Sequence, residues 1–188
     1  MSYQETRDIA VRAKLAAYTS IRDRGHDAPA LLESVASVVA GVFGERLASG
    51  PELLVAVIHT VVGAVHGVSE AGAAVGGEAA AIMSGVLRGA RRVGRPTLET
   101  VNMLANMLVR TGAGVGGDPL AAALGAVDGG RACALDLDVP VDASAGAAAA
   151  GALRAAAEMN PLLADRIREA IGAGDGDEAL HRSAPSRR

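Results

Sequence analysis

The sequence has very few aromatic residues and almost no cysteine. Tryptophan is absent from its 188 residues, and aromatic side chains make up 2% of the chain. Small-molecule pockets are lined mainly by apolar and aromatic groups, so this scarcity argues against an enzyme with such a pocket. The single cysteine, Cys133, excludes an intrachain disulfide and a multi-cysteine metal site, and we predict that it is a small core residue.

Lysine is also scarce, and Lys14 is the only one. The net charge of −3 argues against general nucleic-acid binding, which depends on clustered positive charge. The longest strongly apolar run, Leu53–Val68, is interrupted by His59 and His66 and is shorter than a membrane span of about 20 residues. The first residues are charged and lack the apolar stretch of a signal peptide. We therefore expect a soluble, cytoplasmic protein without a cofactor.

What the sequence does contain is alanine, valine, leucine and glycine in a repeat of about 22 residues. Half of the chain is apolar, and 24 residues are glycine. A fixed period with a helix breaker in nearly every unit is typical of repeat architectures. Met107 stands where a glycine of the series is missing. The glycines that keep the period are Gly41, Gly63, Gly85, Gly129 and Gly151.

The repeat predicts an all-α fold, because alanine and leucine dominate and the breakers fall between the apolar segments. Glycine after a helix end and proline at the next start support these boundaries. Short turns predict an antiparallel helical bundle or a short α-solenoid built from ~22-residue helix-turn repeats. The expected helices span 5–24, 30–48, 52–71, 77–93, 97–112, 119–135, 142–158 and 161–172.

This reading divides the chain into an N-terminal helix at 1–28, a helical repeat domain at 29–172 and a disordered tail at 173–188. The helix at 52–71 has only a thin polar stripe, so we place it in the centre of the fold. The helix at 77–93 has one apolar face and one polar face, so we predict an ordinary surface helix. The polar face comprises Glu78, Ser84, Arg88, Arg91 and Arg92.

Two GxxxG spacings recur in register, and they are candidate contact sites. Gly63 with Gly67, and Gly85 with Gly89, lie on successive units. Glycines at this spacing let two helices approach closely. We predict that all four glycines serve helix–helix or subunit contacts. The spacing leaves open whether they pack within one chain or between chains.

Four arginines near the end of the helix at 77–93 form a second candidate interaction site: Arg88, Arg91, Arg92 and Arg95. Such a patch could hold an acidic partner or a phosphate-bearing surface. The simpler interpretation is that these cations compensate the helix dipole on a solvated face.

A stripe of His59, His66 and Glu70 is a weak candidate metal site. Carboxylate and histidine clusters inside helical bundles hold metal pairs, but those sites repeat a Glu-x-x-His pair on two helices. The sequence does not repeat that pair on two helices, so a solvated stripe is the favoured interpretation and no metal is expected.

Three hypotheses follow from these observations. The favoured one is a non-catalytic scaffold that binds a protein partner, or itself as a homo-oligomer, through its glycine and alanine faces. The second is a lipid- or granule-surface coat, because the 22-residue period punctuated by proline is similar to that of exchangeable apolipoproteins. The near absence of aromatic residues and lysine does not suit such a coat. The third is a helical-bundle metal protein.

Overall fold

The computed structural model describes residues 1–44 and 46–182, with side chains as far as residue 173. These residues form helices packed against each other in a bundle-like arrangement, with no strand among them, so the predicted all-α fold is confirmed. The eight helices are α1 (Tyr3–Arg24), α2 (Ala28–Phe43), α3 (Gly50–Glu70), α4 (Val75–Val93), α5 (Leu98–Gly114), α6 (Pro119–Ala132), α7 (Val141–Met159) and α8 (Pro161–Arg182).

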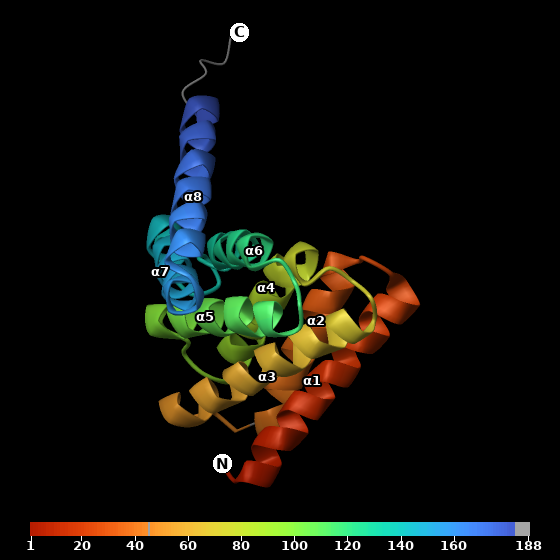
Figure 1. The fold of residues 1–188 in the computed structure, drawn as a ribbon. Helices are drawn as coiled ribbons and strands as arrows, with labels where there is room; N and C mark the ends of the chain where they lie inside the picture. Colours follow the sequence, from red (N-terminus) through yellow and green to blue (C-terminus); the bar gives the residue numbers. More distant parts are fainter. Residues whose placement is uncertain (45, 183–188) are drawn as a thin grey trace, which may run out of the picture.

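The helices form two layers, because each helix packs on the next helix but one as well as on its sequence neighbour. The odd layer runs α1, α3, α5, α7 and the even layer runs α2, α4, α6, α8 (Figure 1). Neighbours within a layer are parallel: Ala10 and Lys14 of α1 meet Gly63 and Gly67 of α3 in the same order. Among the described residues α1 and α2 make no contact with α7 or α8. The stack is therefore open at its α1/α2 end.

Glycine makes these layer contacts possible. A Cβ at Gly85 would lie 2.6 Å from the Leu32 carbonyl oxygen of α2, and one at Gly129 would lie 2.6 Å from Cβ of Met83 in α4. A Cβ at Gly151 of α7 would collide with the carbonyl of Asn102 in α5. The 22-residue glycine period therefore reflects one contact that recurs along the stack. In each case the glycine lets its helix lie directly on the backbone of its neighbour in the same layer.

The one interruption of the period coincides with a looser contact. Met107 of α5 occupies the repeat position that Gly63 and Gly151 hold in α3 and α7. The contact between α3 and α5 is the least extensive one within the odd layer. A long side chain holds two helix axes apart where glycine lets them touch, which accounts for the difference.

Local signals fix the helix ends much as predicted. Ser2 and Glu5 form a capping box at α1, and Ser49 and Glu52 form another at α3. Gly25, Gly44, Gly72 and Gly116 follow α1, α2, α3 and α5 with positive φ, the conformation that glycine adopts most readily. Some helix ends differ from the prediction. The helix predicted at 30–48 ends at Phe43, where Gly44 follows with positive φ, and the one predicted at 119–135 ends at Ala132. The last helix, α8, continues to Arg182 rather than ending at 172. Within the predicted disordered tail, 183–188 lies outside the described residues.

The helix at 77–93 is not the surface helix that was predicted, although Arg88, Arg91 and Arg92 of its polar face are exposed. Most of α4 is buried, and Glu78 and Ser84, assigned to a solvated face, are each only 4% exposed. The helix is buried because glycine has no side chain and lets neighbouring helices come close. α2 packs against Gly85 and Gly89 of α4, and Gly125 and Gly129 of α6 pack against Ala79 and Met83 of α4. Both α2 and α6 therefore cover α4. The hydropathy of the α4 sequence alone does not predict this burial.

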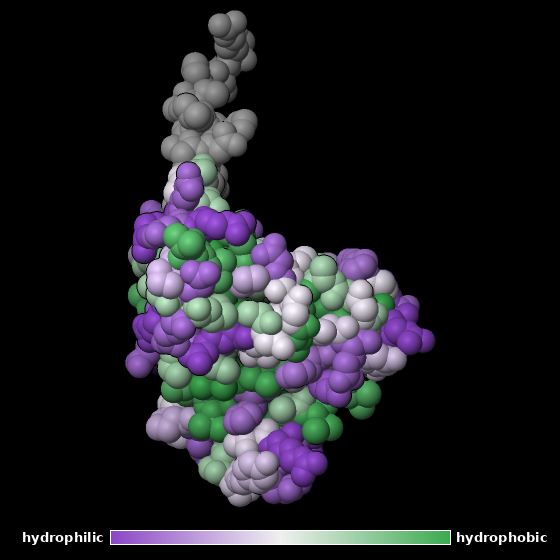
Figure 2. All heavy atoms as spheres, in the orientation of Figure 1, coloured by the Kyte–Doolittle hydropathy of each residue, from purple (hydrophilic) through white to green (hydrophobic). Residues whose placement is uncertain are grey.

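The helix placed at the centre contacts four others. α3 packs on α1, α2, α4 and α5. It is the one described helix long and apolar enough to cross a membrane by length and composition, and 56% of its apolar stretch is buried inside the protein. Its Val55, Ile58 and Val62 are only half-buried. In Figure 2 hydrophobic surface gathers on the face where α3 lies.

Candidate functional site

The four glycines predicted as contact sites lie in the interior of the chain. Gly63 and Gly67 are buried against the α1 backbone, and Gly85 and Gly89 are buried against the α2 backbone. The question that the sequence left open is answered here, because these glycines pack within one chain. In this fold they are core positions and offer no surface to a second molecule.

Three of the four predicted arginines are engaged within the chain. Arg92 makes two hydrogen bonds of 2.9 Å to Glu33 of α2. Arg88 pairs with Asp136 at 3.0 Å, and Arg91 donates to the Asp136 carbonyl oxygen at 3.0 Å. Arg95 is exposed and has no ion pair in the described part of the chain. The patch thus fastens α4 to α2 and to the segment after α6.

The histidine stripe does not converge on a common point. His59 is half-buried, His66 is exposed, and Glu70 forms an ion pair of 2.5 Å with Lys14 of α1. Nowhere in the described residues do three or more His, Cys, Asp or Glu side chains gather as a metal site would require. The ion pair instead ties α3 to α1 alongside their glycine contact.

A surface groove lies between α1 and α2 at the open end of the stack, and we call it the end groove. It comprises two hollows of about 290 Å³ and 540 Å³ that share Arg12. The first is lined by Met1, Glu5, Asp8, Ile9, Arg12, Val42, Phe43, Arg46 and Glu52. The second is lined by Arg12, Ala16, Arg24, Ala30, Glu33, Ser34, Ser37, Val38 and Gly41.

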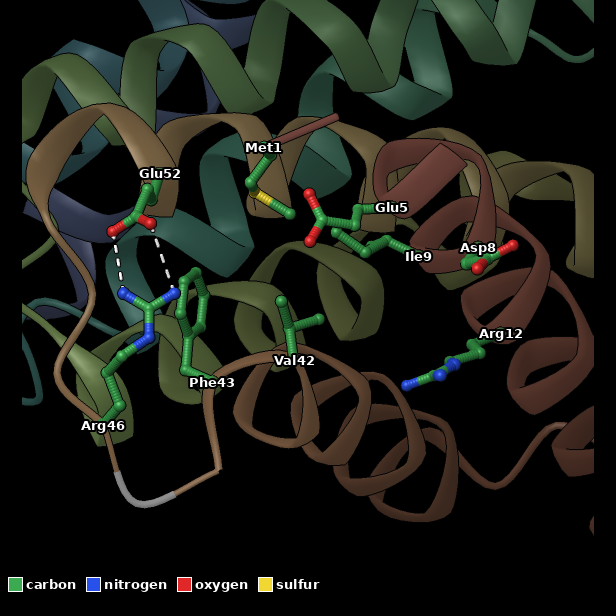
Figure 3. Close-up of a pocket in the computed structure, with 9 residues that line it drawn as sticks. All are labelled: Met1, Glu5, Asp8, Ile9, Arg12, Val42, Phe43, Arg46 and Glu52. Carbon is green, nitrogen blue, oxygen red and sulfur yellow. Dashed lines mark hydrogen bonds and ion pairs between the residues drawn. The ribbon is translucent and has the colours of Figure 1, made fainter. Parts of the chain in front are cut away.

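The first hollow is a mixed-charge site over an apolar floor. Figure 3 shows Arg12 and Glu5 reaching toward the space above Val42, while Arg46 turns to Glu52. The Arg46–Glu52 pair has hydrogen bonds of 2.9 and 3.2 Å, and the guanidinium lies 5.2 Å from the centre of the Phe43 ring. Arg12 has no ion pair among the described residues, so its guanidinium is available to another molecule.

Two carboxyl groups of this hollow, those of Glu52 and Glu5, have lowered pKa values. Hydrogen bonds from Arg46, together with those from Ser49, lower the pKa of Glu52 to about 2. The pKa of Glu5 is lowered as well, chiefly by a hydrogen bond from the Ser2 backbone at the start of α1. Among the described residues, the lining of this hollow consists of carboxylates, guanidinium groups and apolar side chains.

The second hollow has several small residues in its lining, and it contains a repeat position with no helix against it. Gly41 occupies the place in α2 that Gly85 occupies in α4 and Gly129 in α6. A Cβ at Gly41 would meet no atom within 4 Å, whereas one at either of the other two would strike a neighbouring helix. Ser37 precedes Gly41 by one helical turn and is exposed. The end groove thus presents a helix-packing face with no helix on it.

Sequence reasoning missed both the end groove and one buried charge. Glu78 is almost wholly buried and accepts a hydrogen bond at 2.7 Å from Nδ1 of His26, which lies in the turn between α1 and α2. No sequence spacing links residues 52 positions apart. Gly41, by contrast, was visible as a member of the glycine series, and its place in the first even helix was the available signal.

The buried thiol agrees with its predicted place in the core. Cys133 is fully buried, and burial raises the pKa of its thiol. A thiol in such surroundings is held in its unreactive protonated form.

The comparisons with known proteins add no relative to this description. No protein-family model matches the chain, and searches of curated proteins and of solved structures found no match.

Proposed function

We propose that this chain is a non-catalytic interaction scaffold that docks a helical protein surface in its end groove. The observation that carries the proposal is the open repeat position at Gly41. Inside the chain the same position receives a helix at Gly85 and at Gly129. A face built for helix packing and left uncovered is the kind of surface that partner helices recognise.

Charge supports recognition rather than reaction at this groove. Within the chain, layer contacts are flanked by ion pairs, such as Arg92–Glu33 between α4 and α2 and Lys14–Glu70 between α1 and α3. In the end groove Arg12 and Arg24 have no ion pair in the part of the chain that is described. A docked partner with acidic side chains would form ion pairs with these arginines, like those beside the interior helix contacts.

A lipid-surface coat is the second candidate, and one observation favours it. Apolar side chains of α3, namely Val55, Ile58 and Val62, are only half-buried, and Val11 and Leu15 of neighbouring α1 are exposed. The packing of all eight helices around shared cores supports the scaffold over the coat, since a coat would lay these faces on lipid.

Vesicle flotation combined with circular dichroism separates the two functions. For a scaffold we expect full helical content in buffer alone and no protein floating with vesicles of phosphatidylcholine and phosphatidylglycerol. A coat would gain helicity on adding vesicles and would float with them. Substantial co-flotation of the wild-type protein overturns the scaffold proposal.

A further inference from the structure

We infer that the partner in the end groove is a second copy of this chain, which docks face to face in an antiparallel, twofold-symmetric dimer. This inference rests on the proposed function and names its partner. It is carried by the order of charges along α1. In a twofold dimer the same surface meets itself in reverse, so only a surface whose two ends complement each other can pair in this way.

The end groove has opposite charges at its two ends. Glu5 and Asp8 line it near the start of α1, and Arg24 lines it near the end of that helix. The other two acidic groups, Glu52 and Glu33, already pair with Arg46 and Arg92. Arg12, which also has no ion pair in the described part of the chain, lies between the two ends. Asp8 and Arg24 at the two ends are about 24 Å apart along the helix, at 1.5 Å per residue.

The middle of the groove contains small side chains, which would let two copies of the chain come close together. Ala16 lies midway between Asp8 and Arg24 and lines the same groove, with Ser34 and Ser37 of α2 across from it. A twofold axis beside Ala16 places Asp8 of one copy opposite Arg24 of the other, and does so twice. Small residues at the axis permit close backbone approach, as they do inside the chain.

Apolar side chains within the groove add the burial that a dimer needs. Val42 lines the first hollow and Val38 lines the second, both on α2 and both only half-buried. A partner seated in the groove would bury them further. Apolar contacts near the centre of an interface and complementary charges toward its ends are usual in protein complexes.

The first test is oligomeric state, measured by sedimentation velocity from about 1 to 200 µM in low salt. We expect a monomer–dimer equilibrium for the wild type. Gly41→Leu fills the groove without meeting any atom of its own chain, and it should raise the dimer dissociation constant at least tenfold. Gly146→Leu is the matched control, because Gly146 is also an exposed helical glycine with open space around it. It should leave the constant unchanged.

A charge swap tests the antiparallel arrangement itself. Arg24→Asp alone should weaken the dimer at least tenfold, because it sets two carboxylates against each other at both ends, the new one and Asp8 of the other copy. Asp8→Arg combined with Arg24→Asp restores opposite signs and should recover most of the affinity. Arg166→Asp, an exposed reversal on α8, is the control. Circular dichroism of each variant checks that it has folded.

Three results would overturn the inference: a wild type that stays monomeric at about 200 µM, a dimer that Gly41→Leu leaves intact, or a charge swap that fails to rescue. None of these would overturn the scaffold proposal, which vesicle flotation tests independently. A larger closed or open-ended oligomer would also contradict the twofold arrangement, since head-to-tail contacts generate rings or filaments.

Discussion

The two core clusters of this protein are built from side chains of different size. The larger cluster is formed mainly by α1–α5 and contains large aliphatic residues such as Leu31, Ile82 and Leu104. The smaller one lies among α5–α8 and consists of Val109, Ile167 and six alanines. Each buried leucine contributes roughly 1.5–3 kcal/mol, and an alanine much less. The smaller cluster therefore needs another source of stability.

Hydrogen bonds between neighbouring helices supply part of that stability. Asn102 and Asn106 of α5 donate to the carbonyl oxygens of Ala147 and Gly151 in α7, at 3.1 and 3.3 Å. Ser144 of α7 donates to the Gly130 carbonyl oxygen at 2.8 Å. Such bonds across a layer require the helices to lie very close. Small side chains bury less aliphatic surface, but they let helix backbones come close together. At that short distance polar side chains can hydrogen-bond to the carbonyl oxygens of the neighbouring helix.

The largest expected effect is common to both regions, because it concerns glycine contacts. Gly63→Leu with Gly85→Leu, in the larger cluster, should destabilise the fold by more than about 4 kcal/mol, since each side chain meets a helix backbone that cannot move aside. Gly151→Leu should do the same in the smaller one. Gly146→Leu is the control, and it should melt no lower than the wild type, because its side chain meets no atom and leucine favours a helix more than glycine does. An unchanged melting temperature in the glycine variants would refute close helix contact.

The next effect should separate the two regions. Leu104→Ala in the larger cluster should cost about 2–5 kcal/mol, because it leaves a cavity among fully buried neighbours. Ala155→Gly in the smaller cluster removes one methyl group and should cost about 1 kcal/mol, mainly through helix propensity. Urea unfolding of both variants measures the difference. Equal costs would mean that side-chain volume does not distinguish the clusters.

A smaller effect tests the hydrogen bonds that support the alanine-rich region. Asn106→Ala should cost about 1 kcal/mol, the usual net contribution of one hydrogen bond. Asn106→Leu retains bulk but cannot donate to Gly151, so it should be destabilised to a similar extent. If the leucine variant unfolds at the wild-type urea midpoint, packing rather than the hydrogen bond is what position 106 provides.

The smallest effect concerns pH, at the α1/α2 end of the larger cluster. The pKa of Glu52 is lowered from 4.5 to about 2, so its contribution to stability is complete above about 4.5 and is lost as the pH falls toward 2. Glu52→Gln should therefore unfold slightly earlier than the wild type at about pH 7, with the gap closing near pH 2. Thermal melts at both pH values measure the gap. A gap that widens in acid contradicts the sign of this linkage.

Local chemistry was predictable along most of the chain, while burial was not. The helices predicted to start at 5, 30, 52 and 119 begin within two residues of those positions, because helix breakers and caps act over a few residues. The prediction that Glu78 and Ser84 of the helix at 77–93 are solvated was wrong. Their exposure depends on how closely α6 packs on this helix, and glycines of α6 allow a close approach. The arginine patch likewise looked free in sequence, although its partners Glu33 and Asp136 come from distant parts of the chain.

The sequence by itself determined an all-α repeat with a 22-residue unit, because helix propensity, breakers and caps are local properties. It also marked the glycines as contact positions. Only the tertiary structure decided that these glycines pack within the chain, each against the helix two earlier in the sequence. It also decided that, of Gly41, Gly85 and Gly129, Gly41 has no helix packed against it. The physical reason is that a glycine is the same residue at every repeat, whereas its neighbour depends on where in the stack its helix lies.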